Sequence, residues 1–133
     1  MALTPEVMRK AQAEIDSIVG NDRLPTLKDR QHLPYVDALT KEVFRWNIVA
    51  PLGLPHCSIE DDVHNGYFIP KGSIVMVNIK GILHDPEVYA DPQKFNPERF
   101  IATEGRPAEP DPRHVTFGFG RRICPGAVIT ACL

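Results

Sequence analysis

The sequence lacks three features that would each assign a protein to a broad class: an excess of one charge, a long apolar run and a leader segment. Its 133 residues carry 15 basic and 17 acidic side chains, and so balanced a charge offers no basic surface for nucleic acid. Three prolines, Pro51, Pro55 and Pro70, interrupt the apolar runs, and no run reaches the roughly 20 residues of a membrane helix. The first residues, MALTPEVMRKAQ, have neither the basic start nor the apolar core of a signal peptide. We therefore expect no nucleic-acid partner, no membrane segment and no secretory leader in this chain.

Paired cysteines are also missing. The three cysteines, Cys57, Cys124 and Cys132, are odd in number and share no C-x-x-C spacing, which favours a reducing compartment over a disulfide framework. An intracellular protein is therefore expected. The remaining composition, 43% apolar and 24% charged, is ordinary for a globular chain, and a chain of this length can bury roughly two-thirds of the surface that its unfolded form exposes.

Two helices are predicted in the first part of the chain. Thr4 supplies a capping hydroxyl and Pro5 a first-turn proline, and apolar residues then recur at helical spacing, which predicts a helix over residues 5–19. The second helix has Pro34 in its first turn. Pro51 is expected to close it, because the residue before a proline is pushed out of the helical region.

The middle of the chain changes to strand and loop signals. Asn65-Gly66 predicts a tight hairpin, a second turn is expected at residues 70–72, and a β-branched run follows over residues 74–79. A short helical turn is expected at residues 85–87, and the proline-rich residues 96–115 form a long irregular loop. The predicted class is therefore α+β, mostly helical, with a small antiparallel hairpin sheet and a long irregular loop.

Two charged residues fall on the apolar face of the second helix. Glu42 and Arg45 are three residues apart and share this face with Ala38 and Val49. The commoner outcome for such a pair is a surface ion pair that contributes under about 1 kcal/mol. A buried pair would need further hydrogen bonds, because removing two charges from water costs several kcal/mol. Arg99 in FNPERF could supply those donors.

The segment FGFGRRICPG, residues 117–126, places one thiol among glycines and arginines. A thiolate is the reactive and metal-binding form of cysteine, and neighbouring cations and helix N-termini stabilise it. Arg121 and Arg122 precede Cys124, and the sequence after Pro125 is expected to start a helix. Gly118 and Gly120 let backbone amides turn toward the sulfur and let a flat ligand approach closely.

Four kinds of site could use such a thiol. A zinc site needs three or four ligands, and the other cysteines and histidines offer no suitable spacing. A nucleophilic cysteine needs a histidine base; His114 is close in sequence, but the usual signatures are absent. Phosphate binding by the glycines would call for a G-K-[ST] sequence, which does not follow. An axial thiolate on haem iron needs one protein ligand only, which matches the residue count.

The loop, the Glu-x-x-Arg helix and FNPERF together resemble the cytochrome P-450 family of haem-thiolate monooxygenases. The family's pattern F-x-x-G-x-R-x-C-x-G is met at Phe117, Gly120, Arg122, Cys124 and Gly126. The segments PEVMRKAQAEID, IPKGSIV and LHDPEVYADPQKFNPERF resemble the eukaryotic microsomal type. The resemblance covers essentially the whole chain, so residues 1–133 are expected to form a partial, C-terminal portion of this fold, from its J-like helix to the start of the helix after the cysteine loop.

The resemblance also implies roles for single residues. Cys124 would be the axial ligand of the iron in haem b, with Arg122 and His56 at the haem propionates. Phe117 would shield the sulfur, and the glycines of the loop would allow close approach. The residues that the resemblance places at the cofactor are Cys124, Arg122, His56, Phe117, Gly118 and Gly126. Glu42, Arg45 and Arg99 would form a three-way ion network beside the haem loop.

The activity implied by the resemblance is insertion of one oxygen atom from O2 into a small apolar organic substrate. The electrons would come from NADPH through a cytochrome P-450 reductase, and members of this type typically reside at the endoplasmic reticulum membrane. The apolar residues 48–54 would reach the substrate pocket. No catalytic residue is predicted in this chain, because the family's distal helix, with its proton-delivering acid and alcohol, has no counterpart here. The alternative hypothesis is a truncated, non-catalytic remnant that binds haem weakly or not at all.

Overall fold

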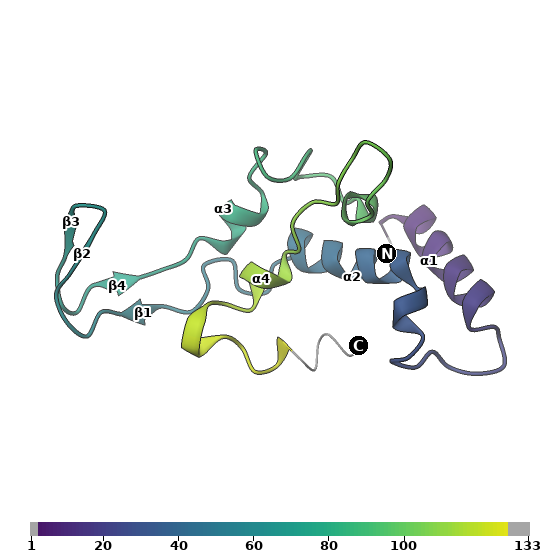
Figure 1. The fold of residues 1–133 in the computed structure, drawn as a ribbon, viewed down its shortest axis with the longest axis horizontal. Coiled ribbons are helices and arrows are strands. Elements are labelled where there is room, and N and C mark those ends of the chain that lie inside the picture. The colour runs from purple at the N-terminus through teal and green to yellow at the C-terminus, as the bar shows by residue number, and fades with distance from the viewer. Residues whose placement is uncertain (1–2, 128–133) are drawn as a thin grey trace.

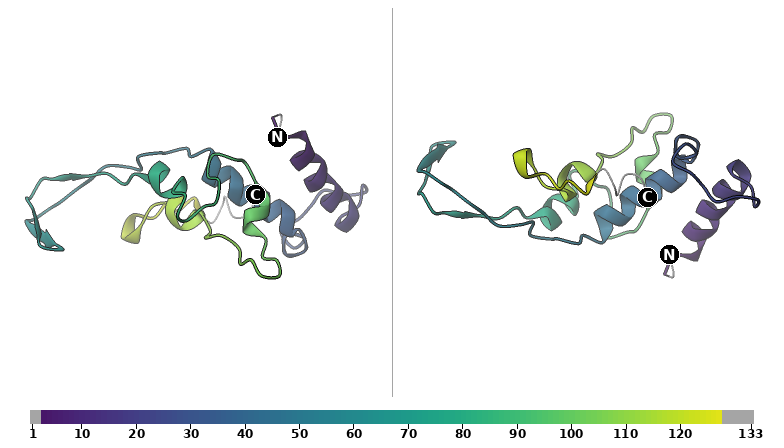
Figure 2. Two further views of the ribbon diagram at one scale, coloured as in Figure 1. Left: turned by 90° about the horizontal axis from the view of Figure 1, so that it is seen from above. Right: turned by 90° about the horizontal axis from the view of Figure 1, so that it is seen from below.

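The computed structural model describes residues 3–127; Cys132 and most of the helix predicted after Pro125 lie outside them. Helix α2, Pro34–Trp46, occupies the middle of an elongated molecule (Figure 1). Helix α1, Pro5–Ile18, lies at one end and four short strands lie at the other, an order that both further views repeat (Figure 2). The segment that joins α1 to α2 contains one short 3₁₀ helix, η1, Arg30–His32.

Helix α1 agrees with the prediction to within one residue at its end. It begins at Pro5, whose missing N–H is harmless in a first turn, and it ends at Ile18. The predicted hydroxyl cap is wrong: the Thr4 side chain makes no capping hydrogen bond, and the Thr4 carbonyl instead accepts the Val7 amide at 3.1 Å. Val7 and Ala11 are the buried residues of this helix, and they contact the α2 residues Tyr35 and Leu39 in one apolar cluster.

Helix α2 is shorter than predicted. It ends at Trp46 rather than near Pro51, and Asn47 leaves the helical region with φ −115° and ψ 81°. Two causes are visible: the Trp46 indole N–H donates to the Gln93 carbonyl at 2.9 Å, and β-branched residues, which are weak helix formers, follow Asn47. Val49, predicted on the buried face of the helix, lies beyond its end and is 88% exposed.

The predicted hairpin is confirmed. Strand β2, Asp62–His64, pairs antiparallel with β3, Tyr67–Ile69. The two residues between them, Asn65 and Gly66, both have positive φ, 50° and 83°, as a type I′ turn requires. A second antiparallel pair joins β1, His56–Cys57, to β4, Ile74–Val75. Among the described residues there are therefore two small two-stranded sheets, where the sequence predicted one.

The predicted run of strand over residues 74–79 is wrong beyond Val75. The turn before it is confirmed, since the Ser73 amide donates to the Pro70 carbonyl at 3.1 Å. After Val75, however, the Asn78 side chain accepts the Gly81 amide at 2.9 Å and caps a short helix, α3, Ile79–Leu83. An N-terminal asparagine cap stabilises a helix, and this helix buries its first and last residues in the core.

The predicted irregular loop over residues 96–115 contains two short helical segments. A 3₁₀ helix, η2, Pro97–Phe100, opens it, and α4, Arg113–Thr116, closes it. An isolated bridge between Thr103 and Arg106 lies between them. A last 3₁₀ turn, η3, Gly120–Arg122, leads into the cysteine segment. A turn is also present where the sequence predicts one, at residues 85–87. In it the Asp85 carbonyl accepts the Tyr89 amide at 2.9 Å.

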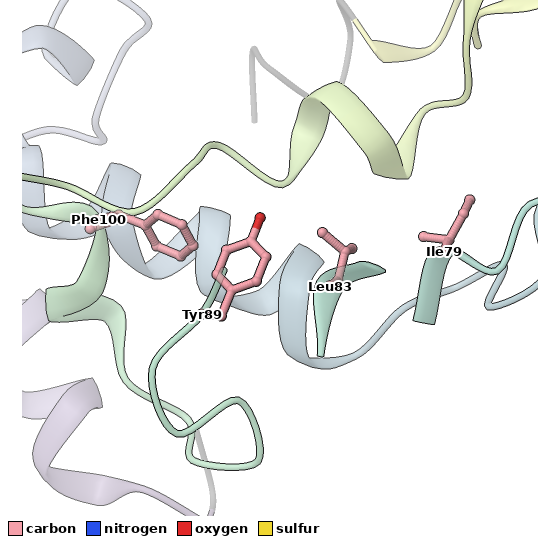
Figure 3. Close-up of a cluster of buried hydrophobic side chains, with 5 residues drawn as sticks. Ile79, Leu83, Tyr89 and Phe100 are labelled. Carbon is pink, nitrogen blue, oxygen red and sulfur yellow. The ribbon is translucent and has the colours of Figure 1, made fainter. Parts of the chain in front are cut away.

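The main core follows one side of α2. Ala38 of α2 contacts Ile79 and Leu83 of α3 together with Tyr89 and Phe100, and Figure 3 shows the last four side chains in a row along the helix. The core therefore attaches α3, η2 and the loop between them to α2. The class predicted from the sequence, α+β with mainly helical structure, is confirmed. Within residues 3–127, no helix is both long enough and apolar enough to cross a membrane.

Candidate functional site

The cysteine segment forms a loop held by its own backbone. The Cys124 amide donates to the Phe117 carbonyl at 2.8 Å, which closes the segment into a loop. Gly118 and Gly120 have φ of 80° and 61°, values that a residue with a side chain rarely adopts. These two glycines therefore allow the turn that brings Cys124 back to Phe117. The Cys124 thiol is exposed and forms no disulfide.

This loop forms one wall of a cavity of about 960 Å³. The other walls come from the end of α2, the segment after it, the strand pair β1–β4 and the start of α3. The lining is mainly apolar and consists of Phe44, Val49, Ala50, Gly53, Leu54, His56, Cys57, Ser58, Val75, Val77, Ile79, Thr116, Phe117, Gly118, Phe119, Gly120, Arg122, Cys124 and Pro125. Pockets for organic ligands in proteins are typically of about 300–1,000 Å³ and mostly apolar, so this cavity has the size and character of a ligand site.

Five of the six residues that the resemblance places at a cofactor line this one cavity: His56, Phe117, Gly118, Arg122 and Cys124. They come from β1 and from the loop, more than 60 positions apart in the sequence. The sixth, Gly126, is not among the lining residues. A Cβ atom at this glycine would lie 3.4 Å from the Cys124 sulfur, so a side chain there would be in van der Waals contact with the thiol.

Phe117 connects the loop to α2. Its ring contacts the Phe44 ring edge to face, with centroids 5.4 Å apart. Such aromatic pairs contribute about 0.5–1.5 kcal/mol beyond their buried area. Because the Phe117 carbonyl also holds the Cys124 amide, the position of the thiol depends on this ring contact.

Glu42 is the centre of a buried ion network. Its carboxylate accepts Arg45 Nε at 2.7 Å and the Asn96 amide at 2.8 Å, and Arg99 Nε lies 3.2 Å from Oε2. The side chains of Glu42 and Arg45 are 0% exposed, and that of Arg99 is 3% exposed. The structure therefore places these three residues together and inside the protein, not at the surface. Buried charges are tolerated only when their hydrogen-bonding capacity is met.

The two arginines use their remaining donors on backbone carbonyls. Arg45 Nη1 donates to the Leu83 carbonyl at 3.0 Å, and the guanidinium lies over the Tyr89 ring at 5.5 Å from its centroid. Arg99 Nη1 donates to the Ala90 carbonyl at 2.7 Å, and Nη2 to the Lys94 carbonyl at 3.1 Å. The network thus fixes residues 83–99, which have little regular structure, against α2.

Glu109 is a fourth member of the network that the sequence did not reveal. Its Oε2 accepts Arg99 Nη1 at 2.7 Å, and its amide donates to the Arg99 carbonyl at 2.9 Å. The side chain of Glu109 is 20% exposed. A glutamate between Pro107 and Pro110 in a polar loop carries no sequence signal for this role, because the contact depends on how the loop returns to η2.

A second charged cluster was also missed. It lies at the start of α2, where Asp37 accepts Arg30 Nη2 at 2.6 Å and lies 2.8 Å from Lys41 Nζ and 3.8 Å from Arg113 Nη1. Burial opposes the ionisation of Asp37, but the hydrogen bonds from Lys41 and Arg30 outweigh it and hold the pKa of this carboxyl below its usual range. Asp37 is therefore a stable anion between three cations.

Asp111 completes this cluster. Its carboxylate accepts Arg113 Nε at 2.9 Å and Arg113 Nη2 at 2.5 Å. Burial again opposes ionisation, and the hydrogen bonds from the side chain and amide of Arg113 overcome it, so that the pKa of Asp111 lies below its usual range. The sequence could have indicated this ion pair, because Asp111 and Arg113 have opposite charges and lie two positions apart at the start of α4.

The chemistry of the cavity suits a flat, mainly apolar cofactor with acidic substituents. Two thiols, Cys57 and Cys124, line the cavity, and Arg122 and His56 supply groups that can bind carboxylates. Within residues 3–127, the Arg122 side chain has no ion-pair partner of its own. In the same part of the chain, no three His, Cys, Asp or Glu side chains come together to hold a metal ion. Of the two thiols, Cys124 is the one that follows a cavity-lining arginine, Arg122, by two positions, and a single thiolate with such a neighbour fits haem.

Comparison with known proteins gives a consistent result. The sequence pattern of the family described as cytochrome P-450 matches residues 1–132. Cytochrome P-450 monooxygenase 208 of Postia placenta is 64% identical over 126 residues, which are 95% of this chain and 25% of that protein. The O-methylsterigmatocystin oxidoreductase of Aspergillus flavus is 52% identical over 130 residues, 98% of this chain and 25% of that protein. The chain therefore spans about a quarter of the length of these relatives.

Proposed function

The chain belongs to the cytochrome P-450 family, and we propose that residues 1–133 are the cofactor-binding, C-terminal portion of a haem-thiolate monooxygenase. The observation that carries this proposal is the convergence of Cys124, Arg122 and His56 on one apolar cavity of about 960 Å³. The similarity to relatives named as monooxygenases, including one from Ampulloclitocybe clavipes at 55% identity, supports the reaction class. The proposed substrate is a small apolar organic molecule.

In this proposal the Cys124 thiolate would hold the iron of haem b. Haem held by a thiolate would supply O–O cleavage chemistry, by which one atom of O2 would enter the substrate and the other would become water, with two electrons and two protons consumed. NADPH supplies those electrons through a cytochrome P-450 reductase. We propose no catalytic residue in this chain.

The side chains around Cys124 bind and orient. Arg122 and His56 bind the two propionates, because a guanidinium and an imidazole can both donate to a carboxylate. Phe117, held against Phe44 at 5.4 Å between ring centroids, would shield the sulfur once the cofactor occupies the cavity. Gly118, which lines the cavity, leaves room for the flat ring, and Gly126 leaves space beside the Cys124 sulfur. The Phe117 carbonyl fixes the Cys124 backbone and with it the direction of the thiol.

The rest of the cavity suits an apolar substrate. Val49, Leu54, Val75 and Val77 line it and offer no hydrogen-bonding side-chain group. Apolar walls favour apolar ligands, because binding removes apolar surface from water. These residues do not specify one substrate, since aliphatic side chains distinguish between ligands mainly by shape and size.

A second candidate is that this chain by itself binds haem weakly and is not catalytic. One observation favours it: Val49 and Leu54, which line the cavity, are 88% and 78% exposed. A cavity with walls so open to water gains less from burying an apolar ligand, because the free energy of burial scales with the area removed from water.

A haemin titration tests the proposal and separates the two candidates. The purified chain is mixed with haemin, reduced and exposed to carbon monoxide. We expect a red-shifted Soret band typical of thiolate ligation that is lost in Cys124→Ala. The matched control is Cys57→Ala, which removes the other exposed thiol of the same cavity and is expected to keep the band.

A thiolate spectrum that survives Cys124→Ala, or that disappears in Cys57→Ala, would refute the assigned ligand. A chain that shows no haem-dependent spectrum at any haemin concentration would leave the weak-binding candidate standing. Turnover of substrate by the chain alone would exclude that second candidate.

A further inference from the structure

Helix α4 and the loop after it lie on α2 at two points. At the first, Arg113 Nη1 of α4 lies 3.8 Å from Asp37 Oδ1 of α2. At the second, the Phe117 ring contacts the Phe44 ring at 5.4 Å. Asp37 and Phe44 are seven residues apart, two helical turns or about 10.5 Å along the same face of α2. The two contacts therefore set both the position and the direction of the segment that leads to Cys124.

The first contact is built from three side chains. Arg113 is held by Asp111 through Nε at 2.9 Å and Nη2 at 2.5 Å, which leaves Nη1 directed to Asp37. All three side chains are largely buried, with exposed fractions of 23–24%. A guanidinium fixed at two nitrogens by one carboxylate has a defined direction, unlike a single-point ion pair.

A continuous series of backbone hydrogen bonds connects this contact to the thiol. The Thr116 amide donates to the Pro112 carbonyl at 2.9 Å, the Gly118 amide to the Val115 carbonyl at 3.1 Å, and the Cys124 amide to the Phe117 carbonyl at 2.8 Å. The Thr116 hydroxyl adds a bond to the Pro112 carbonyl at 2.8 Å. A shift of Arg113 would therefore be transmitted along α4 to the residue that holds the Cys124 backbone.

We propose that Arg113 is a positioning residue for Cys124: held by Asp111 and directed at Asp37, it anchors α4 on α2 and so fixes the loop that presents the thiol to the cavity. The cofactor part of this inference rests on the proposed function. Arg113 itself does not line the cavity, so it acts through α4 and Phe117 and not by contact with a ligand.

Hydrogen exchange of the cofactor-free chain tests the anchor directly. Arg113→Gln removes the charge and the fork of donors, and we expect the Cys124 amide to exchange roughly five- to tenfold faster, as loss of a bidentate, partly buried ion pair predicts. Amides in α1 are expected to keep their exchange rates. Arg113→Lys keeps the charge but not the fork of donors. We expect the Cys124 amide in this variant to exchange faster than in the unchanged chain and more slowly than in Arg113→Gln.

The matched control is Arg23→Gln. Arg23 donates to both oxygens of Asp29 at 2.7 Å, a bidentate pair like that of Arg113, but it lies in the segment between α1 and α2. We expect no change at Cys124 in this variant. As a second readout, haemin binding to Arg113→Gln should weaken by a similar five- to tenfold, while Arg23→Gln should bind as the unchanged chain does.

Three results would overturn the inference: an unprotected Cys124 amide in the unchanged chain, unchanged exchange at Cys124 in Arg113→Gln, or equal acceleration at Cys124 and throughout α1. The last would show a general loss of stability in place of a local anchor. If the unchanged chain binds no haemin, the proposed function fails for this chain, but the exchange of the Cys124 amide still decides whether Arg113 anchors the loop.

Discussion

The Glu14 carboxylate of α1 accepts the Tyr35 amide at the start of α2, with Oε1 2.9 Å from the nitrogen. The other oxygen accepts the Val36 amide at the same distance. Helix α2 has no side-chain cap of its own, because Leu33 occupies the capping position. Two of the unpaired amides that begin every helix are thus satisfied by a residue 21 positions earlier, and the same contact fixes the two helices relative to each other.

Glu14→Ala is expected to destabilise the chain by about 1 kcal/mol, the usual cost of losing a helix cap. The loss combines two amide hydrogen bonds with a negative charge near the positive end of α2. Urea unfolding followed by the fluorescence of Trp46, the single tryptophan, measures it. Asp16→Ala is the control, since Asp16 is an exposed acid of the same helix. Equal costs for the two variants would contradict the capping role of Glu14.

Glu42→Gln is expected to cost about 3–5 kcal/mol, because it leaves Arg45 and Arg99 buried with too little negative charge. Glu109→Gln removes a more exposed carboxylate of the same network, and we expect about 1 kcal/mol. Urea midpoints of the two variants provide the comparison. If Glu109→Gln were as costly as Glu42→Gln, the distinction between the buried centre and the rim of the network would be wrong.

His84 should make the stability of the chain depend on pH. Its Nδ1 is buried without a hydrogen-bond partner among the described residues. Burial, with the nearby charge of Arg45 second, holds the pKa of His84 below its usual value of 6.5. Because the folded state binds the proton less tightly than the unfolded state, the contribution of neutral His84 is fully present above pH 6.5 and is lost as the pH falls through the lowered pKa.

The free energy of unfolding should therefore fall on acidification from pH 7 to pH 5, and it should fall less in His84→Gln. His64→Gln, which changes an exposed histidine of the hairpin, is the control and should keep the full pH dependence. Chemical unfolding at several pH values gives these curves. Identical slopes for His84→Gln and the unchanged chain would disprove the assignment.

Tyr89 should resist ionisation. Burial in the core raises the pKa of its hydroxyl to about 12, and the hydroxyl donates to the Pro110 carbonyl at 3.2 Å. An ultraviolet titration of the folded chain should show one of the three tyrosines ionising well above the others, and this late step should be missing in Tyr89→Phe. If Tyr89→Phe still shows a tyrosine that ionises at this high pH, the late ionisation belongs to another residue.

Local sequence signals predicted several elements correctly because the physics behind them is local. Asn65-Gly66 sets a type I′ turn whatever surrounds it, since both residues tolerate positive φ. A first-turn proline fixes the start of α1 and of α2 for a similar reason. At the end of α2 the sequence signal failed because a distant partner decided the outcome: the Trp46 indole donates to the Gln93 carbonyl. At residues 76–79 it failed because the β-branched run indicated a strand, whereas the local cap of Asn78 on the Gly81 amide starts a helix.

The sequence by itself determined the family, the α+β class and the residue types of the candidate site, because the cysteine loop and Glu-x-x-Arg are short patterns with defined spacing. Only the tertiary structure decided which of these residues meet. His56 and Cys124 reach one cavity because β1 pairs with β4 and the loop folds back onto Phe117. Arg99, Glu109, Arg113 and Asp37 find their partners across irregular segments, where no periodicity relates positions in the chain to positions in space.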